Sequence, residues 1–363
     1  MAESRINRLR ESMAAKGLDA MLVTEPANVF YLAGFADFVD IAAAAIITAT
    51  DSCLLVDPRY TVEAQAESKG VRVVEYFGKS TVAAISDLTN ELAPSHMGYE
   101  SDSVTVSMFR ELRRRVNSSV SLRSTKGFVQ MLRRTKDADE IALMQKAMEI
   151  ADATFVSVVK DIRVGMTEKE VALLIDNTLR KLGADKEAFE TIAASGPNSA
   201  CPHATPTGAI LKPGQFLKMD FGARYHHYNS DITRTVSIGK PSKKQKEVYK
   251  IVLDAQLMAI DAIAPGKPGK EIDAVARDYI ASKGYGDNFG HGLGHALGIT
   301  VHDGPALSRT SEVVLEPGMI VTVEPGIYIE GWGGVRIEDD VVVTETGMKV
   351  LTKATKELII IEG

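Results

Sequence analysis

The sequence is poor in cysteine and lacks any long apolar segment. Only two cysteines, Cys53 and Cys201, occur among its 363 residues. That is too few for a disulfide framework and favours a reducing compartment. The longest apolar run, residues 41–49, is far shorter than the roughly 20 residues that a membrane-spanning helix requires. The charged N-terminal segment also lacks the apolar core of a secretory signal. These absences predict a cytoplasmic protein that does not enter a membrane.

The sequence also lacks a long cluster of basic or of acidic residues. Its 42 basic and 48 acidic residues give a formal net charge of −6. The one basic cluster, residues 113–115, is too short to bind nucleic-acid phosphates. Hydrophobic residues make up 45% of the chain and charged residues 25%, which is typical of globular proteins. The length suits two domains, so we expect a two-domain protein with no nucleic-acid partner.

The first predicted domain, residues 1–126, has the pattern of an α/β unit. An amphipathic helix is expected near the N-terminus, followed by a strand at residues 19–23. The apolar segments 41–48 and 53–56 bracket a polar turn, which predicts a hairpin. This part of the chain contains one histidine, His96, and no convergent set of carboxylates. We therefore expect it to have a structural role or to shape access to a site elsewhere.

The second predicted domain, residues 127–363, opens with a long amphipathic helix and contains an internal repeat. Asp137 and Glu140 have the spacing of a capping box at the start of this helix. The two copies of the repeat share positions at equal spacing: Gly165, Glu170 and Gly183 in the first correspond to Gly266, Glu271 and Gly284 in the second. Asp220 and Glu324 each stand seven residues after the proline of a Pro-Gly pair. We infer two related α/β halves across a pseudo-twofold axis, each with a carboxylate at an equivalent strand end.

Acidic residues and histidines gather in short segments of this second domain. The candidate ligands are Asp220, Asp231, His295, Glu324 and Glu338. Asp220 and Glu324 lie in apolar runs, where a carboxylate costs several kcal/mol unless it is paired or bound to a metal. Four carboxylates and one imidazole suit two divalent cations of intermediate hardness, Mn²⁺ or Co²⁺ before Zn²⁺. Because no thiolate accompanies them, a structural zinc site is disfavoured.

The order and spacing of these motifs resemble the M24 metallopeptidases, the family of Xaa-Pro aminopeptidase (aminopeptidase P) and Xaa-Pro dipeptidase (prolidase). Asp220 and Asp231 are eleven residues apart, and Glu324 and Glu338 are fourteen apart. The resemblance covers nearly the whole chain. It implies an α/β (α+β) protein in which a creatinase-like N-terminal domain precedes a pseudo-twofold catalytic domain of the pita-bread fold.

The resemblance also implies roles for individual residues. Asp231 and Glu338 would bridge two metal ions, and a hydroxide between the metals would attack the scissile carbonyl. Thr233 would orient a ligand carboxylate. The implied remaining ligands are Asp220, His295 and Glu324. The implied catalytic residues are His203, His302 and Glu324, with Glu324 as the proton shuttle, and the implied substrate-binding residues are His291 and Arg336.

These features predict an Xaa-Pro aminopeptidase that acts on proline-containing peptides, and the resemblance implies a homodimer. The alternative is an Xaa-Pro dipeptidase. Prolidases often have an arginine four residues after the position of His302, whereas this chain has Ala306 there, which favours the aminopeptidase although Arg309 is close enough to substitute. A metal-free creatinase-type hydrolase and a peptide-binding module both predict lost metal ligands, and methionine aminopeptidases typically lack the N-terminal domain. A thiol mechanism at Cys201 lacks an evident base with a third orienting group.

Overall fold

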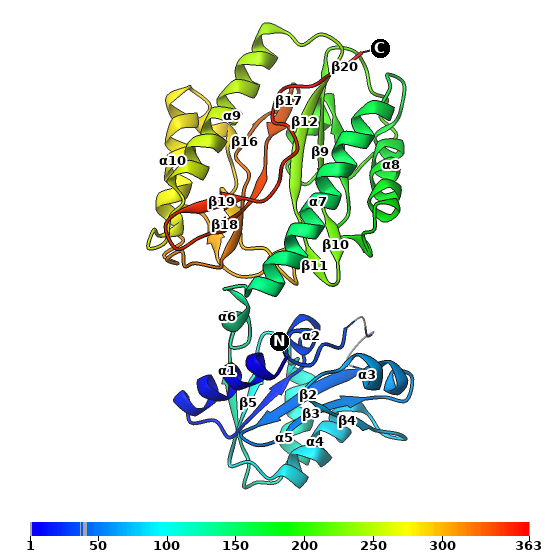
Figure 1. The fold of residues 1–363 in the computed structure, drawn as a ribbon, viewed down its shortest axis with the longest axis vertical. Coiled ribbons are helices and arrows are strands. Elements are labelled where there is room, and N and C mark those ends of the chain that lie inside the picture. The colour runs from blue at the N-terminus through cyan, green and yellow to red at the C-terminus, as the bar shows by residue number, and fades with distance from the viewer. Residues whose placement is uncertain (1, 37, 39–41, 363) are drawn as a thin grey trace. The chain divides into compact units, whose positions relative to one another are not determined.

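The computed structural model describes residues 2–36, 38 and 42–362 (Figure 1). Contacts between residues divide the chain into two compact units, Met1–Arg133 and Arg134–Gly363. The boundary predicted from the sequence, between residues 126 and 127, lies a short distance before this division. Within the described ranges, no helix combines the length and the apolar character needed to cross a membrane.

The first unit contains a six-stranded sheet in the order β4-β3-β2-β1-β5-β6. Its strands are β1 (Ala20–Val23), β2 (Ala43–Thr48), β3 (Ser52–Val56), β4 (Arg72–Glu75), β5 (His96–Glu100) and β6 (Ser121–Thr125). Its helices are α1 (Ala2–Ala15), α2 (Pro26–Ala33), α3 (Thr61–Glu67), α4 (Thr81–Leu92), α5 (Val106–Arg115) and α6 (Gln130–Arg133). The predicted hairpin corresponds to β2 and β3, but Ile41, its first predicted residue, lies outside the described residues. Arg133 donates a hydrogen bond to Asn28 (2.6 Å), which joins α6 to this unit.

The second unit consists of two pairs of helices and several short sheets. Its helices are α7 (Ala138–Asp161), α8 (Glu168–Lys181), α9 (Lys243–Ala262) and α10 (Gly269–Ser282), with the single turns η1 (Gly196–Ala200) and η2 (Gly286–Asn288). The strands of the first half are β7 (Lys186–Glu187), β8 (Ile192–Ser195), β9 (Gln215–Phe221), β10 (Ala223–Tyr225), β11 (Tyr228–Asn229) and β12 (Ile232–Ile238). The strands that follow are β13 (Gly294–His295), β14 (Ala306–Leu307), β15 (Ile320–Val323), β16 (Gly326–Ile329), β17 (Gly333–Arg336), β18 (Asp339–Val343), β19 (Met348–Val350) and β20 (Ile360–Ile361). The predicted capping box of Asp137 and Glu140 is present at the start of α7.

The internal repeat predicted from the sequence is present in the backbone. The N–H of Gly165 donates to the carbonyl of Leu211 (3.1 Å), and the N–H of Gly266 donates to that of Leu315 (2.9 Å). Both glycines have a positive φ, 92° and 85°, which only a residue without a Cβ adopts readily. α7 and α8 cover the apolar core of the first half, and α9 and α10 cover that of the second. Figure 1 shows the two helix pairs on opposite sides of the strands, the organisation expected of a pseudo-twofold domain.

Two equivalent antiparallel strand pairs position the candidate ligands. β9 pairs with β12, with Asp220 opposite Thr233, and β15 pairs with β18, with Val323 opposite Asp339. Successive side chains of a strand point to opposite faces. One face of β9 therefore enters the apolar core of the first half through Leu217, Met219 and Phe221. The other face carries Asp220 toward the seam between the two halves.

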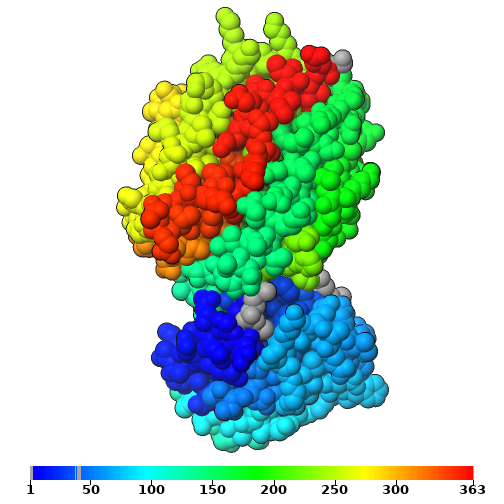
Figure 2. Space-filling model, viewed as in Figure 1, coloured from blue at the N-terminus to red at the C-terminus, as the bar shows by residue number. Residues whose placement is uncertain are grey.

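The segment after β18 crosses the outer surface of this unit between α9 and α7 (Figures 1 and 2). Gln145 of α7 donates to the carbonyl of Leu351 (3.0 Å), and the Tyr249 hydroxyl of α9 donates to the carbonyl of Lys356 (3.0 Å). The C-terminal segment therefore ties the helices of one half to those of the other.

Candidate active site

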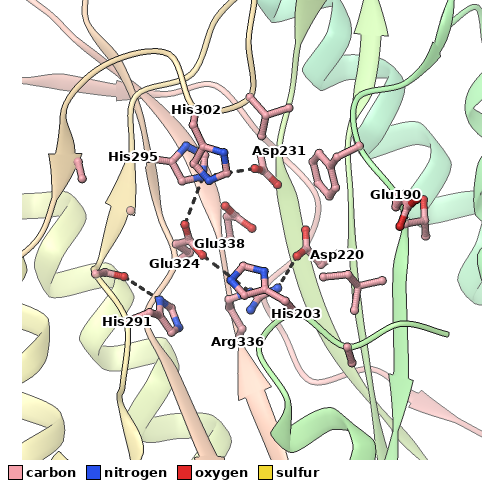
Figure 3. Close-up of a pocket in the computed structure, with 18 of the residues that line it drawn as sticks. Glu190, His203, Asp220, Asp231, His291, His295, His302, Glu324, Arg336 and Glu338 are labelled. Carbon is pink, nitrogen blue, oxygen red and sulfur yellow. Dashed lines mark hydrogen bonds and ion pairs between the residues drawn. The ribbon is translucent and has the colours of Figure 1, made fainter. Parts of the chain in front are cut away.

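Three of the five candidate ligands come together at the seam between the halves (Figure 3). Asp231 stands immediately before β12, Glu338 immediately before β18, and His295 at the end of β13. Each offers one ligand atom, and these atoms all lie within 4.8 Å of one another. Asp231 and Glu338 are only 5% and 2% exposed. The two carboxylates of the cluster are therefore largely buried, while all three residues still line the cavity described below.

The other two candidates, Asp220 and Glu324, lie beside this cluster. Glu324 Oε1 is 3.5 Å from His295 Nε2. Asp220 Oδ2 accepts a hydrogen bond from Arg336 Nη2, while Asp220 Oδ1 is buried and has no hydrogen-bond partner. A buried carboxylate oxygen without a partner is costly. A cation held in the cluster is a partner that would satisfy it.

The electrostatics of the cluster also suit a cation. Burial, followed by the neighbouring Glu338 carboxylate, raises the pKa of Asp231 well above its ordinary value. Burial, followed by the neighbouring Glu324, likewise raises the pKa of Glu338. Burial raises the pKa of Glu324 to about 7. Carboxylates that are buried and repel one another need protons or a multivalent cation, so the residues present fit a divalent metal.

Thr233 contacts the carboxylate of the candidate ligand Glu338. Its hydroxyl donates to Glu338 Oε2 (2.6 Å) and accepts from Arg336 Nε (2.9 Å). The threonine therefore fixes the orientation of one carboxylate oxygen and links it to the guanidinium. Such support would hold a metal ligand in place before a metal binds.

Three histidines of the site, His291, His295 and His302, are electrically neutral near pH 7. Burial lowers the pKa of His295 to about 4 and that of His291 to about 4. Burial also lowers the pKa of His302, whose ring centre lies 4.2 Å from that of His295. A neutral imidazole offers one nitrogen as a ligand or acceptor and one N–H as a donor. His203 lines the same pocket as these three rings.

Tyr328 is a residue of the site that the sequence analysis missed. Its hydroxyl accepts from Arg336 Nη1 (3.0 Å) and lies 2.9 Å from His291 Nε2. The signal was Gly326, two residues earlier on the same face of β16, because a Cβ at that glycine would lie 2.5 Å from the Tyr328 hydroxyl. A glycine in a strand often marks a place where another group lies close to the backbone, and here that group is the Tyr328 hydroxyl.

The five candidate ligands, the four histidine-pocket residues His203, His291, His295 and His302, and Arg336 all line one cavity of about 560 Å³, and Thr233 and Tyr328 contact this lining from behind. Its walls combine the cluster with apolar side chains, and Glu190 stands at a distance from the cluster in Figure 3. Among the described residues that line the cavity, Arg336 is the only arginine or lysine. Cys201 has an exposed thiol and is not among them. Trp332 packs edge-on against Phe216 (5.9 Å between ring centres) and also lies outside the lining.

Comparison with known proteins gives the same organisation over the whole chain. The family model "Metallopeptidase family M24" matches residues 142–345, and "Creatinase/Prolidase N-terminal domain" matches residues 5–135. An Xaa-Pro dipeptidase of Pyrococcus furiosus is 38% identical over 98% of this chain and 100% of its own length. The structure of an Xaa-Pro dipeptidase from Bacillus anthracis is 40% identical with a TM-score of 0.94, covering 99% of this chain and 100% of that chain. The structure of an X-Pro aminopeptidase from Thermotoga maritima is 38% identical with a TM-score of 0.90, covering 98% of this chain and 99% of that chain.

Proposed function

The chain belongs to metallopeptidase family M24, and from this membership we propose that it is an Xaa-Pro dipeptidase that depends on two divalent cations. The observation that carries the proposal is the buried cluster of Asp231, His295 and Glu338 in a cavity large enough for a dipeptide. The relatives named as Xaa-Pro dipeptidases match both units from end to end. Those relatives support the dipeptidase better than the aminopeptidase expected from the sequence.

Five residues would hold the cations, of which we propose Mn²⁺ as the metal. They are Asp220, Asp231, His295, Glu324 and Glu338. When bound, the cations would supply Lewis acidity and a lowered pKa for water at the scissile bond. The oxygen-rich ligand set with a single imidazole suits metals of intermediate hardness.

The residues of the chain would bind the substrate and move its protons. Glu324 lines the cavity beside the cluster and would carry a proton to the leaving proline nitrogen. The rings of His203 and His302 would donate hydrogen bonds to the carbonyl oxygen as charge develops on it.

The proline side of the substrate would meet the network of His291, Tyr328 and Arg336. The Tyr328 hydroxyl is hydrogen-bonded to both His291 and Arg336, and these two residues line the cavity. The nitrogen of an Xaa-Pro bond carries no hydrogen, so the wall facing it needs no acceptor there. We further propose a cytoplasmic homodimer, as the family resemblance implies.

An Xaa-Pro aminopeptidase is the second candidate. It is favoured by the small number of arginine and lysine side chains among the described residues of the cavity wall. All three guanidinium nitrogens of Arg336 already donate hydrogen bonds to protein groups. Ala306 lines the cavity at the position where prolidases often have an arginine. The described wall therefore offers no uncommitted arginine or lysine to the free carboxylate of a dipeptide.

The two candidates are separated by the hydrolysis of Leu-Pro and Leu-Pro-Gly by the Mn²⁺-loaded protein. A dipeptidase has the higher kcat/KM for Leu-Pro, whereas an aminopeptidase has the higher value for Leu-Pro-Gly. Ala306→Arg serves as a directed variant, because an added cation should improve the kcat/KM for the dipeptide and not for the tripeptide. If neither peptide is cleaved, the proposed function is wrong.

A further inference from the structure

Lys218 is a buried amine that the proposed reaction does not use, and burial lowers its pKa to about 6. It stands in the middle of β9 and is 0% exposed. Residues two apart in a strand share a face, so Lys218 projects toward the seam on the same side as Asp220. Burying a lysine amine is unfavourable unless its N–H groups find partners. A methionine would fill the same volume at lower cost.

The partners of Lys218 lie in the loop that leads to His203. Its Nζ donates to the carbonyl oxygen of Cys201 (2.6 Å) and to that of Pro202 (3.1 Å). Arg336 Nη1 donates to the same Pro202 oxygen (3.2 Å). The side chains of Lys218 and Arg336, both buried, thus bind the backbone immediately before His203.

On its remaining side the Lys218 amine faces the ring of Tyr328, with Nζ 5.2 Å from the ring centre. Tyr328 in turn contacts His291 and Arg336 through its hydroxyl. The amine therefore lies behind the wall of the cavity, between the His203 loop and the Tyr328 network.

The His203 loop has little regular structure of its own to hold it. It follows η1 as an irregular segment, and loops of this kind are mobile unless they are anchored. On the far side of His203, the loop is bound through Thr207, whose N–H and hydroxyl both donate to Glu168 (2.9 and 2.6 Å). The loop is therefore hydrogen-bonded to buried side chains on both sides of His203, to Lys218 and Arg336 before it and to Glu168 after it.

We propose that Lys218 is a positioning residue that fixes the His203 imidazole at the cavity by holding the Cys201 and Pro202 carbonyls. The inference rests on the proposed function insofar as His203 contacts the substrate. The contacts need N–H donors, which the amine has in either protonation state. Lys218 therefore acts through the loop and touches neither substrate nor metal.

The test compares Lys218→Met, which keeps the length of the side chain and removes its donors, with Lys218→Gln, which keeps an N–H donor. Lys212→Met, at an exposed position of the same domain, is the matched control. We expect Lys218→Met to lower kcat/KM for an Xaa-Pro substrate about 10- to 100-fold, since small displacements of a catalytic group have effects of this size. Lys218→Gln should fall between Lys218→Met and the wild type, and Lys212→Met should match the wild type. Mn²⁺ affinity should stay within about 3-fold.

A double-mutant cycle distinguishes positioning from a general structural role. In a His203→Ala background, Lys218→Met should cost less than about 2-fold in kcat/KM, because the group that it positions is already absent. An undiminished cost in that background would overturn the proposal. If Lys218→Met does not fold, Lys218→Gln takes its place in the same cycle.

A second readout does not depend on activity. The chain has seven histidines, and the ring resonance of His203 in the ¹³C-histidine spectrum is assigned by its loss in His203→Ala. Lys218→Met should shift this resonance, whereas Lys212→Met should not. An unchanged His203 resonance would also overturn the proposal. Because this spectrum is interpretable even if the protein cleaves no Xaa-Pro bond, failure of the inference and failure of the proposed function give different results.

Discussion

Replacing Glu338 by glutamine should make the metal-free protein more stable while it abolishes peptide hydrolysis. Burial, followed by the charges of Glu324 and Asp220, raises the pKa of Glu338 well above its ordinary value of 4.5. A carboxyl whose pKa is raised by folding contributes stability only below its unfolded pKa, and loses that contribution as the pH rises. At pH 8 the Glu338 side chain therefore destabilises the folded state in either protonation state. If it is ionised, it is repelled by the neighbouring carboxylates; if it is protonated, it keeps a proton that it would lose in the unfolded chain. Glutamine removes both costs.

The size of the effect follows from the geometry of the cluster. Two unit charges at the 4.8 Å limit that encloses the ligand atoms repel by ~3 kcal/mol at an effective dielectric constant of ~20. Part of this repulsion is relieved by proton uptake, so we expect the free energy of unfolding to rise by about 2 kcal/mol. For a unit of this size, the unfolding midpoint should rise by roughly 4–8 °C. The gain should disappear toward pH 4, where the carboxyls are neutral.

The assay is thermal unfolding of the chelator-treated protein at pH 8, with Glu168→Gln as the matched comparison. Glu168 is 0% exposed, but its carboxylate accepts five hydrogen bonds, from Ser195, Asn198 and Thr207. An amide there would turn N–H groups toward these donors, and we expect a loss of about 1–3 kcal/mol. The same substitution should therefore change stability in opposite directions at two buried sites. If Glu338→Gln is destabilising by as much as Glu168→Gln, the reasoning that the cluster is poised for a cation is refuted.

Three further predictions concern the groups around the cluster. His302→Ala should lower kcat/KM about 100-fold and leave Mn²⁺ affinity nearly unchanged, as steady-state kinetics and metal titration would show. Mn²⁺ affinity should rise between about pH 6 and pH 8, because burial raises the pKa of Glu324 to about 7 and the metal must displace its proton; a pH-independent affinity in calorimetric titrations would contradict this. Lys136→Met leaves Asp303, its partner in a buried ion pair (3.7 Å), without that cation and should cost about 3 kcal/mol in chemical denaturation. Lys270→Met, at an exposed pair, should cost less than about 1 kcal/mol.

The parts of the fold that depend on local chemistry could be predicted from the sequence. The helix starting after Asp137 follows from a capping box, and the duplication follows from glycines such as Gly165 and Gly266 that need positive φ at equivalent turns. The candidate ligands could be recognised because acids in apolar strands require a partner, as Asp220 shows. These signals are visible within a few residues or repeat at a fixed spacing.

Residues whose role depends on distant contacts could not be predicted in this way. Lys218 and Tyr328 stand in strands, where the sequence indicates only that they are buried. Their roles depend on contacts with segments that are distant in the sequence and meet them only in the folded chain. The preference for an aminopeptidase rested on the single position of Ala306. Two of the three relatives named above, all matching nearly the whole chain, are Xaa-Pro dipeptidases and one is an X-Pro aminopeptidase. One side chain on a cavity wall is weak evidence of substrate length.

The most direct test of the account is Leu-Pro hydrolysis by metal-stripped protein before and after Mn²⁺ is restored. We predict no measurable cleavage without metal and full recovery with it. Asp231→Asn, which removes a ligand from the cluster, should stay inactive at the Mn²⁺ concentration that restores the wild type. Full activity of the stripped protein, or normal turnover by Asp231→Asn, would contradict the assignment of a metal-dependent peptidase site to this cluster.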